Sequence, residues 1–527
     1  MGRHKFIAIS LVGFIAFTTG GWLQRPGSQD QITATNARIF REVISHVVQY
    51  YVDSLAEADL YDMAIDGMLK RLGDPYTNFL GPEHYRALSL STTGNYAGIG
   101  ISIESRDSWV TVVTTFPDTP GERVGLLPGD QIAEIEEVSI RNWSTTRASQ
   151  RLKGPPGTEV NIKVRRTGME NLLSFSIVRE RIHINSVEGA MMIRPGIGYM
   201  RLLTVSDVSA GETAQALAHL SSLGVRSLIL DLRGNTGGIL NQGVGLADLF
   251  LDSGEVVVET RGRARGASQI YRTQRPQLWS DMKLIVLVNG FTASAAEILS
   301  GALQDHDRAL VLGTPTFGKG VAYLVFPLSD SQAISVTSSR WYTPVGRSID
   351  RPERAALATA VAQATVDSAD TGPETIFHSF GGRPLEGGDG GIQPDIILPD
   401  TLSDGEQRFV AALGASVSDY RSATSQYARQ LQTEHRVSEP DFEVTQQMLG
   451  ELLELVRDRG VDISDSLWYG ARELVSQQLG WDLTRFQFGR AAELRRRASD
   501  DIQVLRAVEL LQEALTTEDL LARTTSN

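Results

Sequence analysis

The chain has 527 residues, too many for one compact domain, and its length suggests roughly three or four domains. Its 41% hydrophobic and 21% charged residues exclude wholesale disorder, and its formal net charge of −13 argues against a nucleic-acid-binding protein, which normally has a basic face. Cysteine is absent, which excludes a cysteine nucleophile, disulfides and cysteine-ligated metals. Covalent catalysis would therefore require serine, threonine, lysine or a carboxylate.

Residues 1–24 are typical of an export signal or a membrane anchor. The basic residues Arg3, His4 and Lys5 precede an apolar stretch from Phe6 to Leu23. This stretch of about 18 residues is just long enough to span a membrane as a helix. Because no clear cleavage site follows, a cleaved signal and a retained anchor both remain open, as does a buried terminal helix. The basic residues on the N-terminal side predict that the rest of the chain lies outside the cytoplasm.

Residues 36–94 are predicted to form an N-terminal helical region. Apolar side chains recur at helical spacing from Ile39 to Tyr51 and again from Leu60 to Leu69. The turn residues Gly73-Asp74-Pro75 end this pattern. Such helices pack against another surface, but the pattern by itself indicates no chemistry.

The apolar spacing changes to that of strands from about residue 95. Short predicted strands, a Gly-Asp turn and one or two short helices over residues 95–182 resemble a PDZ domain, and the segment Gly125 to Ile132 is fairly specific for that fold. The place of the PDZ carboxylate-binding loop is taken by Gly98, Ile99, Gly100 and Ile101. In that loop, backbone N–H groups converge on the C-terminal carboxylate of a peptide, which adds to the sheet as a strand. The two glycines could instead simply allow a tight start to the next strand.

Strands and helices alternate from Ile197 onward, which predicts an α/β core over residues 183–400. The segments Val225 to Leu232 and Leu284 to Val288 are nearly continuous apolar runs, as expected of strands buried on both faces. Two further segments complete the predicted architecture: a flexible insertion at residues 355–371 and a charged, helical C-terminal region at residues 404–527.

Three turns directly follow predicted strands of this core, where sites gather in α/β folds: Asp231 to Gly238, Asn289 to Glu297 and Gly313 to Gly320. The third turn nearly matches a phosphate-binding loop. However, Gly320 stands where a metal-binding hydroxyl is required, and a strand rather than a helix follows Lys319. The sequence therefore disfavours a nucleotide-binding enzyme.

Ser294 and Lys319 could form the reacting pair of a hydrolase. Ser294 begins a predicted helix, where backbone N–H groups favour developing negative charge. One helix and one strand later, Lys319 returns to the same edge of the sheet, where burial would favour the neutral amine that a base requires. The N–H of Ala295 and an N–H of the Gly237-Gly238 turn would then hold the oxyanion. A surface lysine and a helix-capping serine are the ordinary alternative.

An ordered set of motifs accompanies these residues: Gly73 to Thr77, Asp231 to Gly238, Ala293 to Glu297, Thr316 to Gly320, Tyr342 to Ile349 and Gly391 to Asp395. Together with the PDZ segment, they resemble the carboxy-terminal processing proteases, peptidase family S41, over roughly residues 36 to 400. The resemblance implies a crotonase-like α/β serine protease core with an inserted PDZ domain that captures substrate C-termini. It also implies cleavage near apolar C-terminal tails, without metal or nucleotide.

Residue by residue, the resemblance makes Ser294 the nucleophile and Lys319 the general base, with Gly238 and Ala295 as oxyanion-hole donors. One position departs from the family, which commonly has a glutamine four residues after the lysine. Here that residue is Tyr323. Its hydroxyl could still orient the lysine, the enzyme could act as a bare dyad, or the protease could be weak or inactive.

These observations predict a serine endopeptidase of the cell envelope, periplasmic or otherwise extracytoplasmic, associated with the inner membrane through its N-terminal segment. Its expected partners are proteins or peptides with apolar C-termini, with an adaptor lipoprotein as an open question; no cofactor and no nucleic acid are expected. The alternative function is a noncatalytic PDZ scaffold that binds protein tails. If Lys319 is the base, the rate should rise as this residue loses its proton.

Overall fold

The computed structural model describes residues 28–106, 108–166, 168–329, 331–351, 376–387 and 390–523. The predicted signal or anchor (1–24) and the predicted insertion (355–371) lie outside these residues. Within the described part of the chain, no helix has both the length and the apolar character needed to cross a membrane. The chain divides into two compact units, Met1–Phe79 and Leu80–Asn527.

The first unit contains helices α2 (Ser28–Tyr50) and α3 (Glu57–Lys70). They contact each other through the rings of Phe40 and Tyr61, whose centroids lie 5.9 Å apart. The short strand β1 (Asn78–Leu80) follows at the boundary between the units. The helical spacing in the sequence is thus reproduced by two helices.

The second unit begins with helix α4 (Pro82–Thr93) and continues into the PDZ domain. Strand β2 (Asn95–Gly98) pairs with β9 (Glu180–His183). The main sheet has the order β3-β4-β5-β7-β8, with β6 paired to β5, so β3 lies at an edge. The elements are β3 (Ile101–Arg106), β4 (Trp109–Thr115), α5 (Pro120–Arg123), β5 (Gln131–Ile135), β6 (Val138–Ser139), α6 (Thr145–Leu152), β7 (Glu159–Arg165) and β8 (Leu173–Val178).

A six-stranded sheet in the order β10-β11-β12-β15-β16-β21 forms the α/β core. It is parallel from β11 to β21, and only β10 runs antiparallel to its neighbour. Helices α7 (Ser209–Ser222), α8 (Leu240–Ala247) and α9 (Ala295–Asp305) pack on one face in a single buried apolar cluster. The strands are β10 (Val187–Arg194), β11 (Ile197–Leu202), β12 (Ser227–Asp231), β15 (Lys283–Val288), β16 (Leu310–Gly313) and β21 (Ile396–Ile397).

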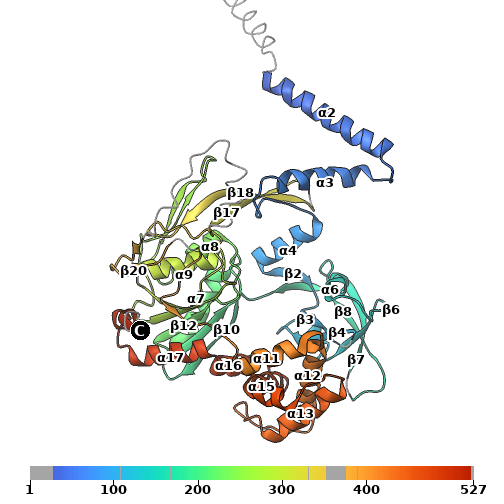
Figure 1. Ribbon diagram of the computed structural model, residues 1–527, viewed down its shortest axis with the longest axis vertical. Helices are drawn as coiled ribbons and strands as arrows, with labels where there is room; N and C mark the ends of the chain where they lie inside the picture. The colour runs from blue at the N-terminus through green and yellow to red at the C-terminus, as the bar shows by residue number, and fades with distance from the viewer. Residues whose placement is uncertain are drawn as a thin grey trace, which may run out of the picture. The chain divides into compact units, whose positions relative to one another are not determined.

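The helical C-terminal region has two parts. Helices α16 (Arg490–Asp500), α17 (Ile502–Glu513) and α18 (Thr517–Ala522) cover the other face of the core sheet, where Val504 and Leu511 share a cluster with Ile285 of β15 (Figure 1). The preceding helices build a separate apolar core: α11 (Asp404–Leu413), the 3-10 turn η1 (Gly414–Ser416), α12 (Val417–Thr433), α13 (Gln446–Asp458), α14 (Asp465–Gly470) and α15 (Arg472–Phe488). The last three helices are therefore part of the α/β core, because they bury its second face.

A second sheet adjoins the α/β core. Strand β18 (Ala333–Tyr342) pairs with β17 (Val321–Pro327) and with β13 (Val256–Arg261), and β13 pairs with β14 (Gln269–Arg272), all antiparallel. A small hairpin joins β19 (Phe377–His378) to β20 (Pro384–Leu385). Strand β17 begins two residues after Lys319, where the sequence predicts a strand.

Candidate active site

Ser294 lies on a sharp turn between β15 and α9. Its backbone has φ 56° and ψ −120°, a conformation that favours glycine and that other residues adopt at a cost of order 1–3 kcal/mol. Neighbouring hydrogen bonds hold the turn: the N–H of Ala293 donates to the Asn235 carbonyl at 2.9 Å, and the Thr292 hydroxyl donates to the Leu232 carbonyl at 2.9 Å. Strain of this kind is typical of functional turns.

The Gly237-Gly238 turn follows β12 and packs against the Ser294 turn. Both glycines have positive φ, 85° and 150°. A Cβ on Gly237 would lie 2.5 Å from the Ala293 carbonyl oxygen and 2.8 Å from the Ser294 Cβ, and a Cβ on Gly238 would overlap the Val205 carbonyl. Only glycine therefore lets this backbone approach the serine so closely.

Two backbone N–H groups beside Ser294 are left for a substrate. Within the described residues, the N–H of Gly238 and the N–H of Ala295 donate no hydrogen bond. The adjacent N–H groups are both used, since Gly237 donates to Asn235 Oδ1 at 2.9 Å and Ala296 donates to the Ala293 carbonyl at 3.2 Å. A pair of unpaired donors next to a serine hydroxyl is the arrangement that stabilises an oxyanion.

Glu297 joins the serine turn to the lysine turn. Its carboxylate is fully buried and accepts hydrogen bonds from the N–H groups of Ser294 (2.7 Å), Gly318 (2.7 Å) and Lys319 (3.0 Å) and from the Thr316 hydroxyl (2.6 Å). Burial raises the pKa of Glu297, and these four donors oppose that rise. No sequence pattern gave Glu297 a role in the reaction, although its place three residues after Ser294 fits a capping pattern.

The side chain of Lys319 lies against Tyr323 of β17. Its half-buried ammonium Nζ is 4.7 Å from the centroid of the Tyr323 ring, within the range of a cation–π contact. Trp341 Nε1 donates to the Lys319 carbonyl at 3.0 Å, which holds the lysine backbone. Burial raises the pKa of Tyr323, so its phenol stays protonated through neutral pH. The lysine side chain thus contacts the face of the Tyr323 ring.

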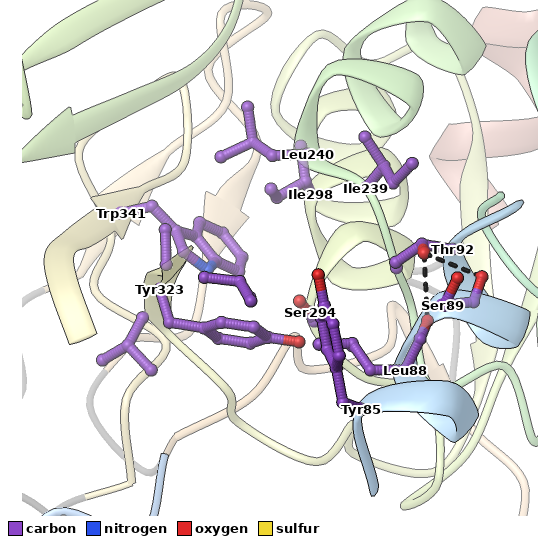
Figure 2. Close-up of a pocket in the computed structure, with 14 residues that line it drawn as sticks. Tyr85, Leu88, Ser89, Thr92, Ile239, Leu240, Ser294, Ile298, Tyr323 and Trp341 are labelled. Carbon is purple, nitrogen blue, oxygen red and sulfur yellow. Dashed lines mark hydrogen bonds between the residues drawn. The ribbon is translucent and has the colours of Figure 1, made fainter. Parts of the chain in front are cut away.

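A cavity of about 380 Å³ opens beside Ser294. In Figure 2, the side chains of Tyr85 and Tyr323 point toward Ser294. The lining is mostly apolar: Tyr85, Leu88, Ser89, Thr92, Gly238, Ile239, Leu240, Ser294, Ile298, Val321, Ala322, Tyr323, Val325 and Trp341. Four of these residues come from α4, a helix for which the sequence indicated no role. Lys319 is not among the described lining residues and lies on the Tyr323 ring instead.

Comparisons with known proteins assign the chain to a family. The sequence model for peptidase family S41 matches residues 196–354, and that for the PDZ domain matches residues 88–165. The chain is 33% identical to the carboxy-terminal-processing protease of Bartonella bacilliformis, over 61% of this chain and 74% of that protein. The chain belongs to peptidase family S41. This S41 peptidase is also 36% identical to the carboxyl-terminal-processing protease of Picosynechococcus sp., over 55% of this chain and 70% of that protein.

Among solved structures, a photosystem II D1 C-terminal processing protease matches 68% of this chain and 92% of its own, with 28% identity and a TM-score of 0.36. The family resemblance and the predicted fold class, an α/β protease core with a PDZ domain and a helical C-terminal region, are confirmed. The protein is thus a carboxy-terminal processing protease, a serine-type hydrolase that acts on protein or peptide substrates.

The predicted tail-binding loop of the S41 peptidase leads into the edge strand β3. Gly98 ends β2, Ile101 begins β3, and the Ile99 side chain is buried in the PDZ core. Gly100 has φ 75°, and a Cβ there would overlap the side chain of Thr119, whose hydroxyl donates to the Gly100 carbonyl at 3.1 Å. Gly100 is therefore required by local packing against Thr119. The loop also lies next to the free edge of β3, the kind of edge to which a peptide strand can add.

The described residues contain no group of three or more histidine, aspartate or glutamate side chains that could hold a metal ion.

The site residues taken from the sequence fall into two sets. Ser294, Gly238 and Ala295 come together at one turn pair, and Lys319 is tied to that pair through Glu297 and contacts Tyr323. The loop from Gly98 to Ile101 belongs to the PDZ domain.

Proposed function

We propose that this S41 peptidase cleaves protein substrates by a Ser294–Lys319 mechanism after its PDZ domain has bound an apolar C-terminal tail. The observation that carries the proposal is the bridge through Glu297, whose carboxylate accepts from the backbone N–H of both residues at 2.7 and 3.0 Å. A buried carboxylate shared by two turns keeps their relative position fixed. A serine and a lysine that took part in no common reaction would not require such a shared carboxylate.

The reaction begins with attack of the Ser294 hydroxyl on the scissile carbonyl carbon. Lys319, as the neutral amine, takes the hydroxyl proton and returns it to the leaving amine, and water then hydrolyses the acyl-enzyme. The N–H groups of Gly238 and Ala295 receive the oxyanion. The cavity beside Ser294, with the apolar residues Ile239, Leu240, Ile298 and Trp341, accepts an apolar substrate side chain.

Tyr323 is proposed to orient Lys319 through its ring face. Tyr323 belongs to β17 and lines the cavity, and its ring supplies an apolar surface along which the lysine side chain can lie. The tyrosine thereby substitutes for the hydrogen-bonding residue more usual at this position. Because the base must be neutral, cleavage should speed up as pH rises through the titration of Lys319.

The tail is proposed to bind at the loop from Gly98 to Ile101. Its carboxylate would meet backbone N–H groups of the loop, and the peptide would pair with the exposed edge of β3. Supporting this, β3 pairs on one side only, with β4, and the buried Ile99 anchors the loop.

The cell envelope is the proposed location, on the basis of residues 1–24 alone. The test is fractionation of cells that make the full chain or a chain lacking these residues. The full chain should leave the cytoplasm, for the membrane fraction if residues 1–24 are retained or for the soluble envelope fraction if they are cleaved, and the shortened chain should stay in the cytoplasm. Equal distribution of the two would contradict the proposal. When the full chain is then purified from its fraction, an adaptor lipoprotein would co-purify with it.

The catalytic proposal is tested by digestion of an unfolded protein that bears an apolar C-terminal tail. The purified enzyme should cleave it, Ser294→Ala should bind without cleaving, and a charged tail should slow cleavage by raising KM. Absence of cleavage by the unchanged enzyme, with retained tail binding, would instead support the noncatalytic PDZ scaffold. Cleavage by Ser294→Ala would refute the assigned nucleophile.

A further inference from the structure

The guanidinium of Arg233 lies where the core sheet meets the C-terminal helices. It holds Asp231 with two hydrogen bonds, from Nε at 2.9 Å and from Nη2 at 2.7 Å. Its remaining nitrogen, Nη1, contacts Asp501 Oδ2 at 2.7 Å and donates to Gln503 Oε1 at 2.9 Å. Asp231 and Gln503 are 2% and 1% exposed, so water screens this cluster little.

The two carboxylate oxygens of Asp501 make different contacts. Oδ1 caps helix α17 by accepting from the N–H groups of Gln503 (2.9 Å) and Val504 (3.1 Å), while Oδ2 faces Arg233. Gln503 is itself held, because its Nε2 donates to the Leu398 carbonyl at 2.6 Å. The capped end of α17 is thus a fixed support for the arginine.

The turn that begins at Arg233 ends at the oxyanion hole. Gly234 N–H donates to Asn289 Oδ1 at 3.1 Å, at the start of the serine turn. Asn235 is fully buried, and it accepts from Gly237 N–H through its side chain and from Ala293 N–H through its carbonyl, both at 2.9 Å. A shift of Arg233 would therefore reach both the Gly238 and the Ala295 donors.

Room for such a shift exists. A cavity of about 950 Å³ lies between the carboxyl edge of the sheet and the C-terminal helices, and Arg233, Asp501 and Gln503 are among its lining residues. Without Asp501, the guanidinium loses its charged contact on the helix side, and the Arg233–Asp231 pair can tilt as a unit toward the cavity.

We infer that Asp501 and Gln503 are positioning residues of the peptidase, which act through Arg233 to hold the oxyanion-hole turn. This inference rests on the proposed function. It gives the C-terminal helices a part in the reaction, although none of their described residues lines the cavity beside Ser294. The C-terminal helices would then be required for the rate of the chemical step, in addition to burying the second face of the core sheet.

The test uses Asp501→Asn in the full chain. Asparagine keeps Oδ1 for the helix cap and removes the charge that faces Arg233. We expect kcat to fall by about 10- to 100-fold with little change in KM, because the loss falls on the transition state. Affinity for a peptide boronic acid, which forms a tetrahedral adduct with the serine, should fall in parallel. Asp501→Ser, which also retains a cap, should behave alike.

Asp465→Asn is the matched control. It breaks a C-terminal ion pair of similar length, 2.6 Å to Arg457, that does not involve Arg233, and it should leave kcat unchanged. Unchanged kcat and boronate affinity in Asp501→Asn would overturn the inference, and so would a loss of activity that only follows a lowered Tm. Failure of the unchanged enzyme to cleave, in the same assay with Ser294→Ala, would instead reject the proposed function.

Discussion

The ammonium of Lys319 lies 4.7 Å from the centre of the Tyr323 ring, on its face. This contact explains how a tyrosine can stand at a position where a hydrogen-bonding residue is usual in the family. A ring face can orient a lysine stem by shape, without a directed hydrogen bond. We therefore expect Lys319 to depend on the ring of Tyr323 more than on its hydroxyl.

Substitutions of Tyr323 distinguish the contribution of its ring from that of its hydroxyl. Tyr323→Phe keeps the ring and should retain kcat within about threefold, whereas Tyr323→Ala should lower kcat by roughly 10- to 100-fold because the lysine loses its support. The measurement is steady-state cleavage of a tailed protein. If Phe is as damaging as Ala, the hydroxyl is the essential group.

Glu297 is expected to matter for both rate and stability. Glu297→Ala leaves three buried or part-buried N–H groups and the Thr316 hydroxyl without their acceptor, at up to about 1–3 kcal/mol each before relaxation. Glu297→Gln keeps one acceptor oxygen and should be less destabilised. We expect both substitutions to lower kcat, Glu297→Ala more than Glu297→Gln. The free energy of unfolding measured in urea should decrease in the same order. Equal kcat in all three proteins would show that the bridge is dispensable.

The stability of the enzyme should fall in acid through Asp231. Burial acts to raise the pKa of this carboxyl, but the charge of Arg233 and hydrogen bonds from Arg233 and Tyr199 outweigh it and lower the pKa below 3.8. Such a group stabilises the fold above its unfolded pKa, and this contribution is lost as pH falls through the folded pKa.

Asp231→Asn provides the comparison. The difference in unfolding free energy between the unchanged protein and this variant should be constant from about pH 7 to 5 and shrink below about pH 4. Urea unfolding at each pH measures it. A difference that persists undiminished to about pH 2 would contradict the assignment.

The tail-binding loop is tested at Gly100. Gly100→Ala adds a Cβ that overlaps Thr119 at a positive φ, so the loop must move and tail-peptide affinity should fall by about tenfold or more. Gly157→Ala is the matched control, because its φ of 82° brings similar strain with no neighbour within 4 Å. Fluorescence anisotropy of a labelled apolar peptide measures both. Equal affinity in the two variants would place the tail elsewhere.

Local patterns in the sequence were enough to single out the candidate turns. Ser294, Lys319 and the glycines at 237 and 238 each follow an apolar strand, and parallel strands end at one edge of a sheet whatever the details of packing. The need for glycine is local in part, because both glycines have a positive φ, but the close approach of Val205 and of the Ser294 turn adds a tertiary reason. The family and the fold class could be inferred for the same reason, from short motifs in a fixed order.

Contacts between distant segments could be seen only in the tertiary structure. The bridge through Glu297, the contribution of α4 to the cavity and the ring contact of Tyr323 depend on how separate elements pack, and helical or strand spacing does not encode this. The contact between Arg233 and Gln503 spans 270 positions of the chain. Sequence alone determined which residues could react in this protein; packing of the sheet between two helical layers decided what holds them in place.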